Sequence, residues 1–161
     1  MSDCCQNPNE DASLFPANNA GHCPACGKKG EVVSTLTVKN LVRDHMRVEA
    51  SAAYLFCRNA NCEIVYFCGQ VVFKKSELKV RVGIKETVDP IPLCYCFDYS
   101  RADIRREIDT ATKVSILDKI KLEVQGGFCA CEVKNPRGSC CLGDITRAIQ
   151  EARGDASQSS A

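Results

Sequence analysis

The chain has 161 residues and a formal charge of only +1, because 21 lysines and arginines nearly balance 20 aspartates and glutamates. This near neutrality argues against a protein that binds nucleic acid or an anionic membrane surface. The length suits one medium domain or two small ones. The 13 cysteines are the informative residues, because a small fold so rich in thiols is expected to be held together by thiol chemistry.

The apolar pattern predicts neither a membrane-spanning helix nor a secretory signal. No apolar run approaches the roughly 20 residues needed to cross a bilayer, and residues 1–11 lack a basic start and an apolar stretch. We therefore expect a cytoplasmic protein without membrane insertion. Because thiols stay reduced in that compartment, the cysteines are expected to be metal ligands or redox groups rather than disulfides.

Two cysteine-bearing modules are predicted between two polar tails. Residues 1–21, which carry Cys4 and Cys5, and residues 154–161 are expected to be disordered because they are polar and lack an apolar period. A small zinc-ribbon-like β module is predicted at 22–88, and a small helical module at 89–153. The expected fold class is therefore α+β.

Short strands are predicted in the first module, where aromatic and β-branched residues cluster at 54–57, 64–67 and 71–73. Residues 79–85 alternate between polar and apolar side chains, which predicts a further strand. Residues 36–46 predict either a short helix or an irregular crossover. Prolines at 90 and 92 are expected to stiffen the link to the second module.

Two pairs of cysteines in the β module have the spacing of a structural zinc site. Four thiolates from two tight turns suit tetrahedral zinc, and a closed shell of four sulfurs leaves no position for a substrate water. The alternative is a redox Cys-x-x-Cys motif, which should open a helix, whereas Gly27 follows this motif directly. His22 is an alternative ligand. The predicted zinc ligands are Cys23, Cys26, Cys57 and Cys62.

Helical spacing dominates the second module. Ser100 and Asp103 have the form of a capping box at the start of one helix. A second helix is predicted to begin near Ser115 and to end at Gly126 and Gly127. A third is predicted over 142–153.

Six cysteines lie near the ends of these predicted helices. Free amides at a helix N-terminus stabilise thiolates, which favours ligands of an anionic metal cluster. A 2Fe-2S cluster takes four cysteines. A second zinc, or six free thiols, is the alternative interpretation. The predicted cluster ligands are Cys94, Cys96, Cys131 and Cys141, with Cys129 and Cys140 as substitutes for the last two.

Seven short motifs follow one another in a fixed order, at 23–26, 57–67, 71–75, 82–86, 94–96, 129–131 and 135–141. This order resembles the N-terminal domain of the two-domain copper chaperone CopZ over about residues 23–153. The resemblance implies one mononuclear zinc and one 2Fe-2S cluster, the latter in a second half that is similar to bacterioferritin-associated ferredoxin. It also implies Cys131 and Cys141 as the later cluster ligands. The βαββαβ copper-carrying domain of that family, with its Met-x-Cys-x-x-Cys loop, has no counterpart in the sequence, so we do not expect copper delivery by such a loop.

These features predict one-electron transfer linked to copper or other soft-metal homeostasis, including reduction of Cu(II) to Cu(I). The alternative is a metal chaperone or sensor that carries Cu(I) on Cys4, Cys5 and the spare cysteines, with zinc and cluster structural. The expected partners are copper or other soft metal ions and an unidentified redox or metal-transfer protein. No hydrolytic or covalent catalytic site is predicted, because neither of the two histidines lies near a plausible nucleophile and base.

Overall fold

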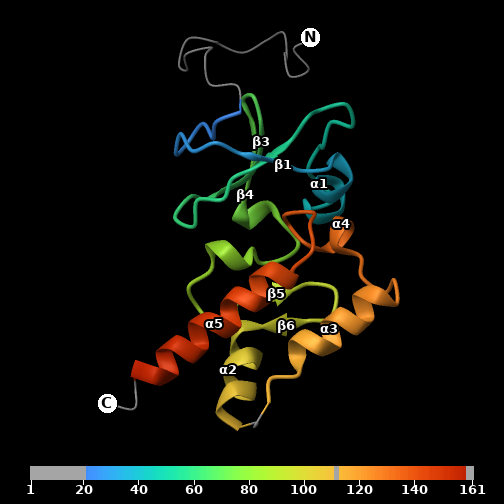
Figure 1. The fold of residues 1–161 in the computed structure, drawn as a ribbon. Coiled ribbons are helices and arrows are strands. Elements are labelled where there is room, and N and C mark those ends of the chain that lie inside the picture. Colours follow the sequence, from blue (N-terminus) through green and yellow to red (C-terminus); the bar gives the residue numbers. More distant parts are fainter. Residues whose placement is uncertain (1–20, 111–112, 159–161) are drawn as a thin grey trace.

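The computed structural model describes residues 21–110 and 113–158 and has a sheet-rich end and a helical end (Figure 1). Four short strands form one antiparallel sheet in the order β1-β2-β3-β4. The mixture of helices with small antiparallel sheets confirms the expected α+β class. The sheet comprises β1 (Glu31–Val32), β2 (Leu55–Phe56), β3 (Ile64–Cys68) and β4 (Val71–Lys74).

The predicted strands at 54–57, 64–67 and 71–73 correspond to β2, β3 and β4. Strand β3 is buried along its whole length, as its unbroken apolar sequence indicates. On β3 and β4, Tyr66 pairs with Phe73 across the ladder, and Gly69 makes the tight turn with a φ of 56°. Aromatic rings from three strands and the segment before β2 therefore form much of the core of this module.

Helix α1 (Thr35–Leu41) packs against this core through Val38. The helix begins where the Ser34 hydroxyl accepts the Leu36 N–H, and it ends because Val42 turns extended and forms a β-bridge with Leu78. The helix alternative for residues 36–46 is thus realised only in the first part of that segment.

The predicted strand at 79–85 is wrong. The segment instead runs alongside the end of α1, where the Lys79 N–H donates to the Leu41 carbonyl, and then forms a single 3₁₀ turn at Gly83–Lys85. No strand lies beside this segment in the described part of the chain, so its other backbone groups find different partners, such as the Tyr95 hydroxyl that accepts the Gly83 N–H. Val82 lies in the core and Ile84 packs against it, but Lys85, at a polar position of the pattern, is buried as well.

The helical module is built from four helices and a two-stranded antiparallel hairpin, β5 (Pro92–Cys94) and β6 (Tyr99–Ser100), that the sequence did not predict. Helices α2 and α3 both pack on α5, with Ile104, Ile120 and Ile145 in the shared core. The helices are α2 (Arg101–Thr110), α3 (Ile116–Gln125), α4 (Cys131–Lys134) and α5 (Leu142–Gln158).

Side chains fix the starts of two of these helices. The capping box predicted for α2 is confirmed, because Asp103 Oδ2 accepts the Ser100 N–H at 2.9 Å and the Asp103 N–H donates to Ser100 Oγ at 3.3 Å. Helix α3 begins differently: Glu107 of α2, rather than Ser115, accepts the Ile116 N–H at 3.0 Å. Gly127, with a φ of 77°, follows the end of α3 as expected.

Helix α5 continues through Gln158, so residues 154–158, which were expected to lie in a disordered tail, are helical. Gly154 does not end the helix, because a glycine inside a helix costs only about 1 kcal/mol and no proline follows it. The expected N-terminal tail, with Cys4 and Cys5, lies outside the described residues apart from Gly21. Among the described helices, none combines the length and the apolar character that crossing a membrane requires.

The two modules meet at a loop, residues 135–139, which we call the docking loop. Its Pro136 carbonyl accepts the Tyr66 hydroxyl of β3 at 2.7 Å, and Arg137 Nε lies 3.8 Å from Glu31 of β1. Just before the loop, the Thr37 hydroxyl of α1 donates to the Glu132 carbonyl of α4. Figure 1 shows α4 beside α1 for this reason, at the junction of the two modules.

Candidate metal centres

Four cysteines, which we call the first tetrad, come from two turns at the edge of the sheet module. Cys23 and Cys26 lie on a turn that closes when the Gly27 N–H donates to the Cys23 carbonyl, with Gly27 at a φ of 69°. Cys57 directly follows β2, and Cys62 lies two residues before β3. Two segments about thirty residues apart in sequence are therefore brought together because β1 and β2 are paired.

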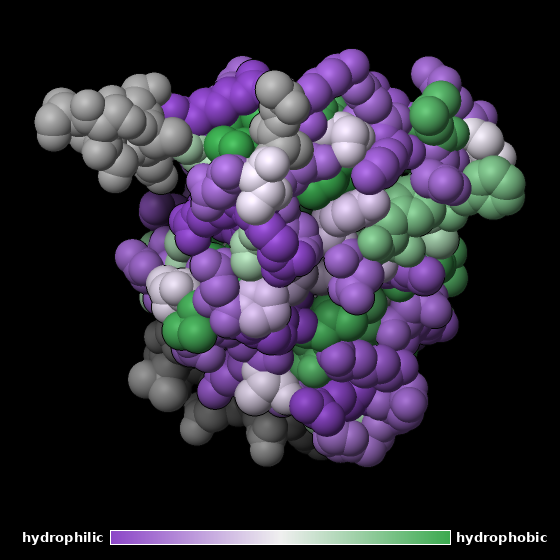
Figure 2. All heavy atoms as spheres, turned by 90° about the horizontal axis from the view of Figure 1, so that it is seen from below, coloured by the Kyte–Doolittle hydropathy of each residue, from purple (hydrophilic) through white to green (hydrophobic). Residues whose placement is uncertain are grey.

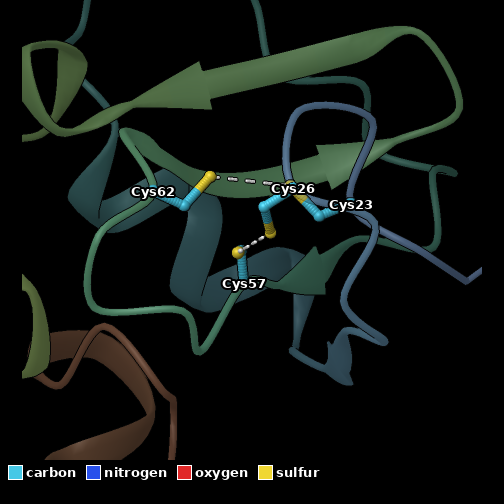
Figure 3. Close-up of side chains that lie close together, drawn as sticks. All are labelled: Cys23, Cys26, Cys57 and Cys62. Carbon is cyan, nitrogen blue, oxygen red and sulfur yellow. Dashed lines mark hydrogen bonds between the residues drawn. The ribbon is translucent and has the colours of Figure 1, made fainter.

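The four sulfurs of the first tetrad point toward one another (Figure 3) and all lie within 4.8 Å of each other. The Cys23 and Cys62 sulfurs are 3.8 Å apart, and those of Cys26 and Cys57 are 3.6 Å apart. A tetrahedron with Zn–S bonds of about 2.3 Å has S–S edges of about 3.8 Å. These two S–S distances match the edges of a zinc–thiolate tetrahedron, and the exposed His22 is not part of this group.

The acidities within the first tetrad differ. Partial burial raises the pKa of Cys26, but hydrogen bonds from the Lys28 backbone, from Asn59 and from neighbouring thiols outweigh it and lower the pKa to about 6. Burial raises the pKa of Cys57 to about 12, against hydrogen bonding and the charge of Lys85. Cys26 thus ionises readily, whereas Cys57 resists ionisation, mainly because it is buried. A bound cation would stabilise both thiolates and so remove this difference in acidity.

Lys85 supports the first tetrad and was not recognised from the sequence. Its side chain is buried, and its Nζ donates to the Asn59 carbonyl at 2.7 Å and to the Cys62 carbonyl at 3.0 Å. These carbonyls belong to the turn that presents the second pair of cysteines. The alternating sequence at 79–85 predicted a strand, and no pattern in the sequence distinguishes a buried lysine there.

The helical module contains the second cysteine set, which comprises Cys94, Cys96, Cys129, Cys131, Cys140 and Cys141. Cys94 ends β5, and Cys96 lies in the turn between β5 and β6. Cys131 is the first residue of α4, and Cys141 immediately precedes α5. Cys131 and Cys141 thus lie at helix starts, as expected. Cys94 and Cys96 are positioned instead by the hairpin that the sequence did not predict.

Four sulfurs of the second cysteine set form two close pairs. Cys96 and Cys131 have their sulfurs 3.6 Å apart, and Cys94 and Cys141 lie close enough that each shifts the pKa of the other. Within the described residues, the first tetrad is the one set of three or more ligand atoms that lie within 4.8 Å of each other. The second set is therefore arranged two by two rather than as a single tetrahedron.

The acidities of these pairs are also uneven. The hydrogen bond from Cys141 lowers the pKa of Cys94 to about 6, and the same contact raises the pKa of Cys141. Burial and the neighbouring Cys96 raise the pKa of Cys131 to about 12. Cys96 Sγ in turn accepts the Ala130 N–H at 3.2 Å.

Cys129 and Cys140 stand outside the two pairs. Cys140 is exposed and Cys129 is half-buried, yet both lie near enough to Cys131 to raise its pKa. The neighbouring Phe128 is 72% exposed. Seen from the helical end, the surface is largely hydrophilic with separate hydrophobic patches (Figure 2).

Comparison with known proteins places this architecture in a family. The sequence model of the CopZ zinc-finger family, described as a zinc binding domain, matches residues 20–79. A relative named Copper chaperone CopZ, from Archaeoglobus fulgidus, is 37% identical over 125 residues, which are 78% of this chain and 60% of the relative. The chain thus spans less than two thirds of that protein. The solved N-terminal domain of Archaeoglobus fulgidus CopZ matches with a TM-score of 0.65 and 34% identity, over 78% of this chain and 95% of that domain. The chain therefore belongs to the family of CopZ N-terminal, zinc-binding domains.

Proposed function

We propose that the first tetrad holds one structural zinc ion. The S–S distances of 3.6 and 3.8 Å fit the edges of a zinc–thiolate tetrahedron, and the match to a zinc binding domain covers all four cysteines. All four positions are occupied by protein sulfur, so no site remains for substrate. The role of this zinc is to join the 23–26 turn to the sheet in place of a larger apolar core.

We further propose that Cys94, Cys96, Cys131 and Cys141 hold a 2Fe-2S cluster. In such a cluster each iron takes two cysteines, so thiolates on one iron lie close together and those on different irons lie farther apart. The pairs Cys96 with Cys131 and Cys94 with Cys141 have this two-by-two arrangement, which is the observation that carries the proposal. A second zinc would favour four mutually close sulfurs.

The function that this arrangement supports best is one-electron transfer in copper handling. When bound, a 2Fe-2S cluster supplies or accepts one electron at a time. The proposed cluster would be accessible from the surface, because Cys96 and Cys131 are only half-buried and the exposed Phe128 precedes Cys129 in the chain. The name of the Archaeoglobus relative supports copper as the metal that receives the electron. One electron from the reduced protein would convert one Cu(II) ion to Cu(I).

The experiment reduces the anaerobic protein with dithionite, removes the excess and adds Cu(II) with a Cu(I)-specific chromophoric chelator. We expect about one Cu(I) per chain, together with the return of the oxidised visible spectrum. Cys131→Ser should abolish both signals, whereas Cys129→Ser, which lies outside the pairs, should keep both. Formation of Cu(I) without any spectral change, or equal loss in the two variants, would contradict the proposal.

A second candidate function is transport of a soft metal on spare thiols. The exposure of Cys140 and the partial exposure of Cys129, both near Cys131, favour it, because Cu(I) prefers thiolates that it can reach. Changing Cys129 and Cys140 to Ser together should then remove one bound Cu(I) while the visible spectrum stays intact. Cys4 and Cys5 lie outside the described residues and are tested by a parallel double serine variant.

A further inference from the structure

Lys85 places a positive charge in the interior of the sheet module. The residue is 4% exposed and lies at the end of the Gly83–Lys85 turn. Lysine is almost never fully buried unless its charge is compensated, because removal of an ammonium group from water is costly. The two carbonyls that accept from its Nζ, at 2.7 and 3.0 Å, satisfy hydrogen bonds but carry no net charge. A compensating negative charge is therefore required nearby.

Among the described residues, no carboxylate forms an ion pair with Lys85. The adjacent Glu86 is engaged elsewhere, 3.3 Å from Lys75 Nζ and 3.0 Å from Arg81 Nη2. Lys75 also donates to the Lys85 carbonyl, so it brings a second positive charge rather than a negative one. The remaining anionic group at this position is the first tetrad itself.

Four thiolates and one zinc ion together carry a net charge of about −2. Lys85 reaches this centre through the Asn59 and Cys62 carbonyls, and the second of these belongs to a ligand. The Asn59 carbonyl also accepts the Cys62 N–H at 3.1 Å, so the lysine bonds to the turn that sets the position of the Cys62 thiol. These contacts thus place one cation next to a centre that carries a net negative charge.

We propose that Lys85 is the internal counter-ion of the zinc centre and a determinant of its zinc affinity. This inference rests on the proposed zinc at the first tetrad. Lys85 is a positioning residue rather than a ligand. It offsets half of the charge that the four thiolates leave on the loaded centre, and it holds the Asn59 to Cys62 turn closed.

The test compares zinc dissociation constants, measured by competition with a chromophoric chelator, for the full chain and three variants. Lys85→Met removes the charge and the hydrogen bonds, whereas Lys85→Gln removes the charge but keeps an amide donor. Both should weaken zinc binding by about tenfold or more, because a unit charge near a buried anion is poorly screened. Lys79→Met is the control. It deletes a lysine that pairs with the exposed Asp44, and it should leave the zinc affinity unchanged.

A spectroscopic readout separates this role from a general contribution to folding. With Co(II) in place of zinc, the Lys85 variants should keep the ligand-field bands of a tetrahedral thiolate site while binding more weakly. If a variant is unfolded as purified, excess zinc should restore its fold by mass action, and failure to do so would overturn the proposal. Wild-type affinity in both Lys85 variants would also overturn it. Absence of zinc from the wild-type protein would instead refute the zinc assignment.

Discussion

The Tyr66 hydroxyl joins the sheet to the docking loop by a single hydrogen bond, 2.7 Å from the Pro136 carbonyl. The side chain is completely buried, and this burial raises the pKa of Tyr66, so the hydroxyl keeps its proton and remains a donor. Loss of the donor would leave a buried carbonyl without a partner, which is more costly than loss of both groups. The contact is therefore a specific link between two segments about seventy residues apart.

Tyr66→Phe is expected to lower the free energy of unfolding by about 2 kcal/mol, as measured by urea denaturation of the metal-loaded protein. The ring and its packing against Phe56 are retained, so the loss reports the hydroxyl alone. Tyr99→Phe is the matched control, because the partly exposed Tyr99 side chain makes no hydrogen bond in the described structure. An equal loss in both variants would contradict this account.

Single residues also show how far the sequence could predict the site. The four zinc-ligand candidates are recognisable because pairs of thiols at short spacing in a reduced protein are typical of metal ligands. Lys85 could not be recognised, because it is buried against the Asn59 and Cys62 carbonyls, which lie more than twenty residues away in the sequence. A buried lysine and an exposed one look the same in an alternating segment.

Individual elements were predictable where a local interaction decides them. Strand β3 reads as an apolar run, and the start of α2 follows from two side chains three residues apart. Helix α4 and the β5–β6 hairpin were missed, because each contains only two to four residues per element and forms against other parts of the fold. The same holds for the end of α5, since nothing local to Gly154 decides whether that helix continues.

The capping box of α2 predicts a pH dependence of stability. Hydrogen bonds from the Ser100 side chain and backbone N–H hold the pKa of Asp103 below its ordinary value of 3.8. Because this pKa is lower in the folded state, the contribution of Asp103 to stability is complete above about pH 5. It is lost as the pH falls through the folded-state pKa. Asp103→Asn should therefore lower the free energy of unfolding by up to about 1 kcal/mol at pH 7.

The measurement is the difference in unfolding free energy between this variant and the wild-type chain at each pH, since loss of metal in acid affects both proteins alike. The difference should shrink below about pH 4, as the wild-type carboxylate becomes protonated. A difference that stays constant down to about pH 3 would show that the Asp103 charge contributes nothing to the helix start.

At the scale of the whole molecule, the docking loop lets the two modules depend on each other. Gly138 lies in this loop with a φ of 65°, and a Cβ there would come within 2.7 Å of Thr37 Oγ1 on α1. The Thr37 side chain cannot easily move, because it is buried and donates to the Glu132 carbonyl. The loop also connects Cys131 to Cys141, so its position on the sheet module influences both cysteine pairs of the helical module.

Gly138→Ala is expected to lower the free energy of unfolding by about 2 kcal/mol or more, from backbone strain and the clash together. Gly127→Ala isolates the strain, because Gly127 has a φ of 77° but open space around its added Cβ. Gly143→Ala, in the first turn of α5 with open space, should be neutral or stabilising. If the Gly138 and Gly127 variants lose the same stability, the contact between docking loop and α1 is unimportant.

We propose that the chain holds two different metal centres, a tetrahedral zinc in the first tetrad and a 2Fe-2S cluster on two cysteine pairs. Native mass spectrometry of the anaerobically purified full chain tests it most directly, with Cys57→Ser and Cys131→Ser measured alongside. The wild-type mass should include one zinc ion and one 2Fe-2S cluster, Cys57→Ser should lose the zinc, and Cys131→Ser should lose the cluster while it keeps the zinc. A wild-type protein that carries two zinc ions and no sulfide would contradict the account.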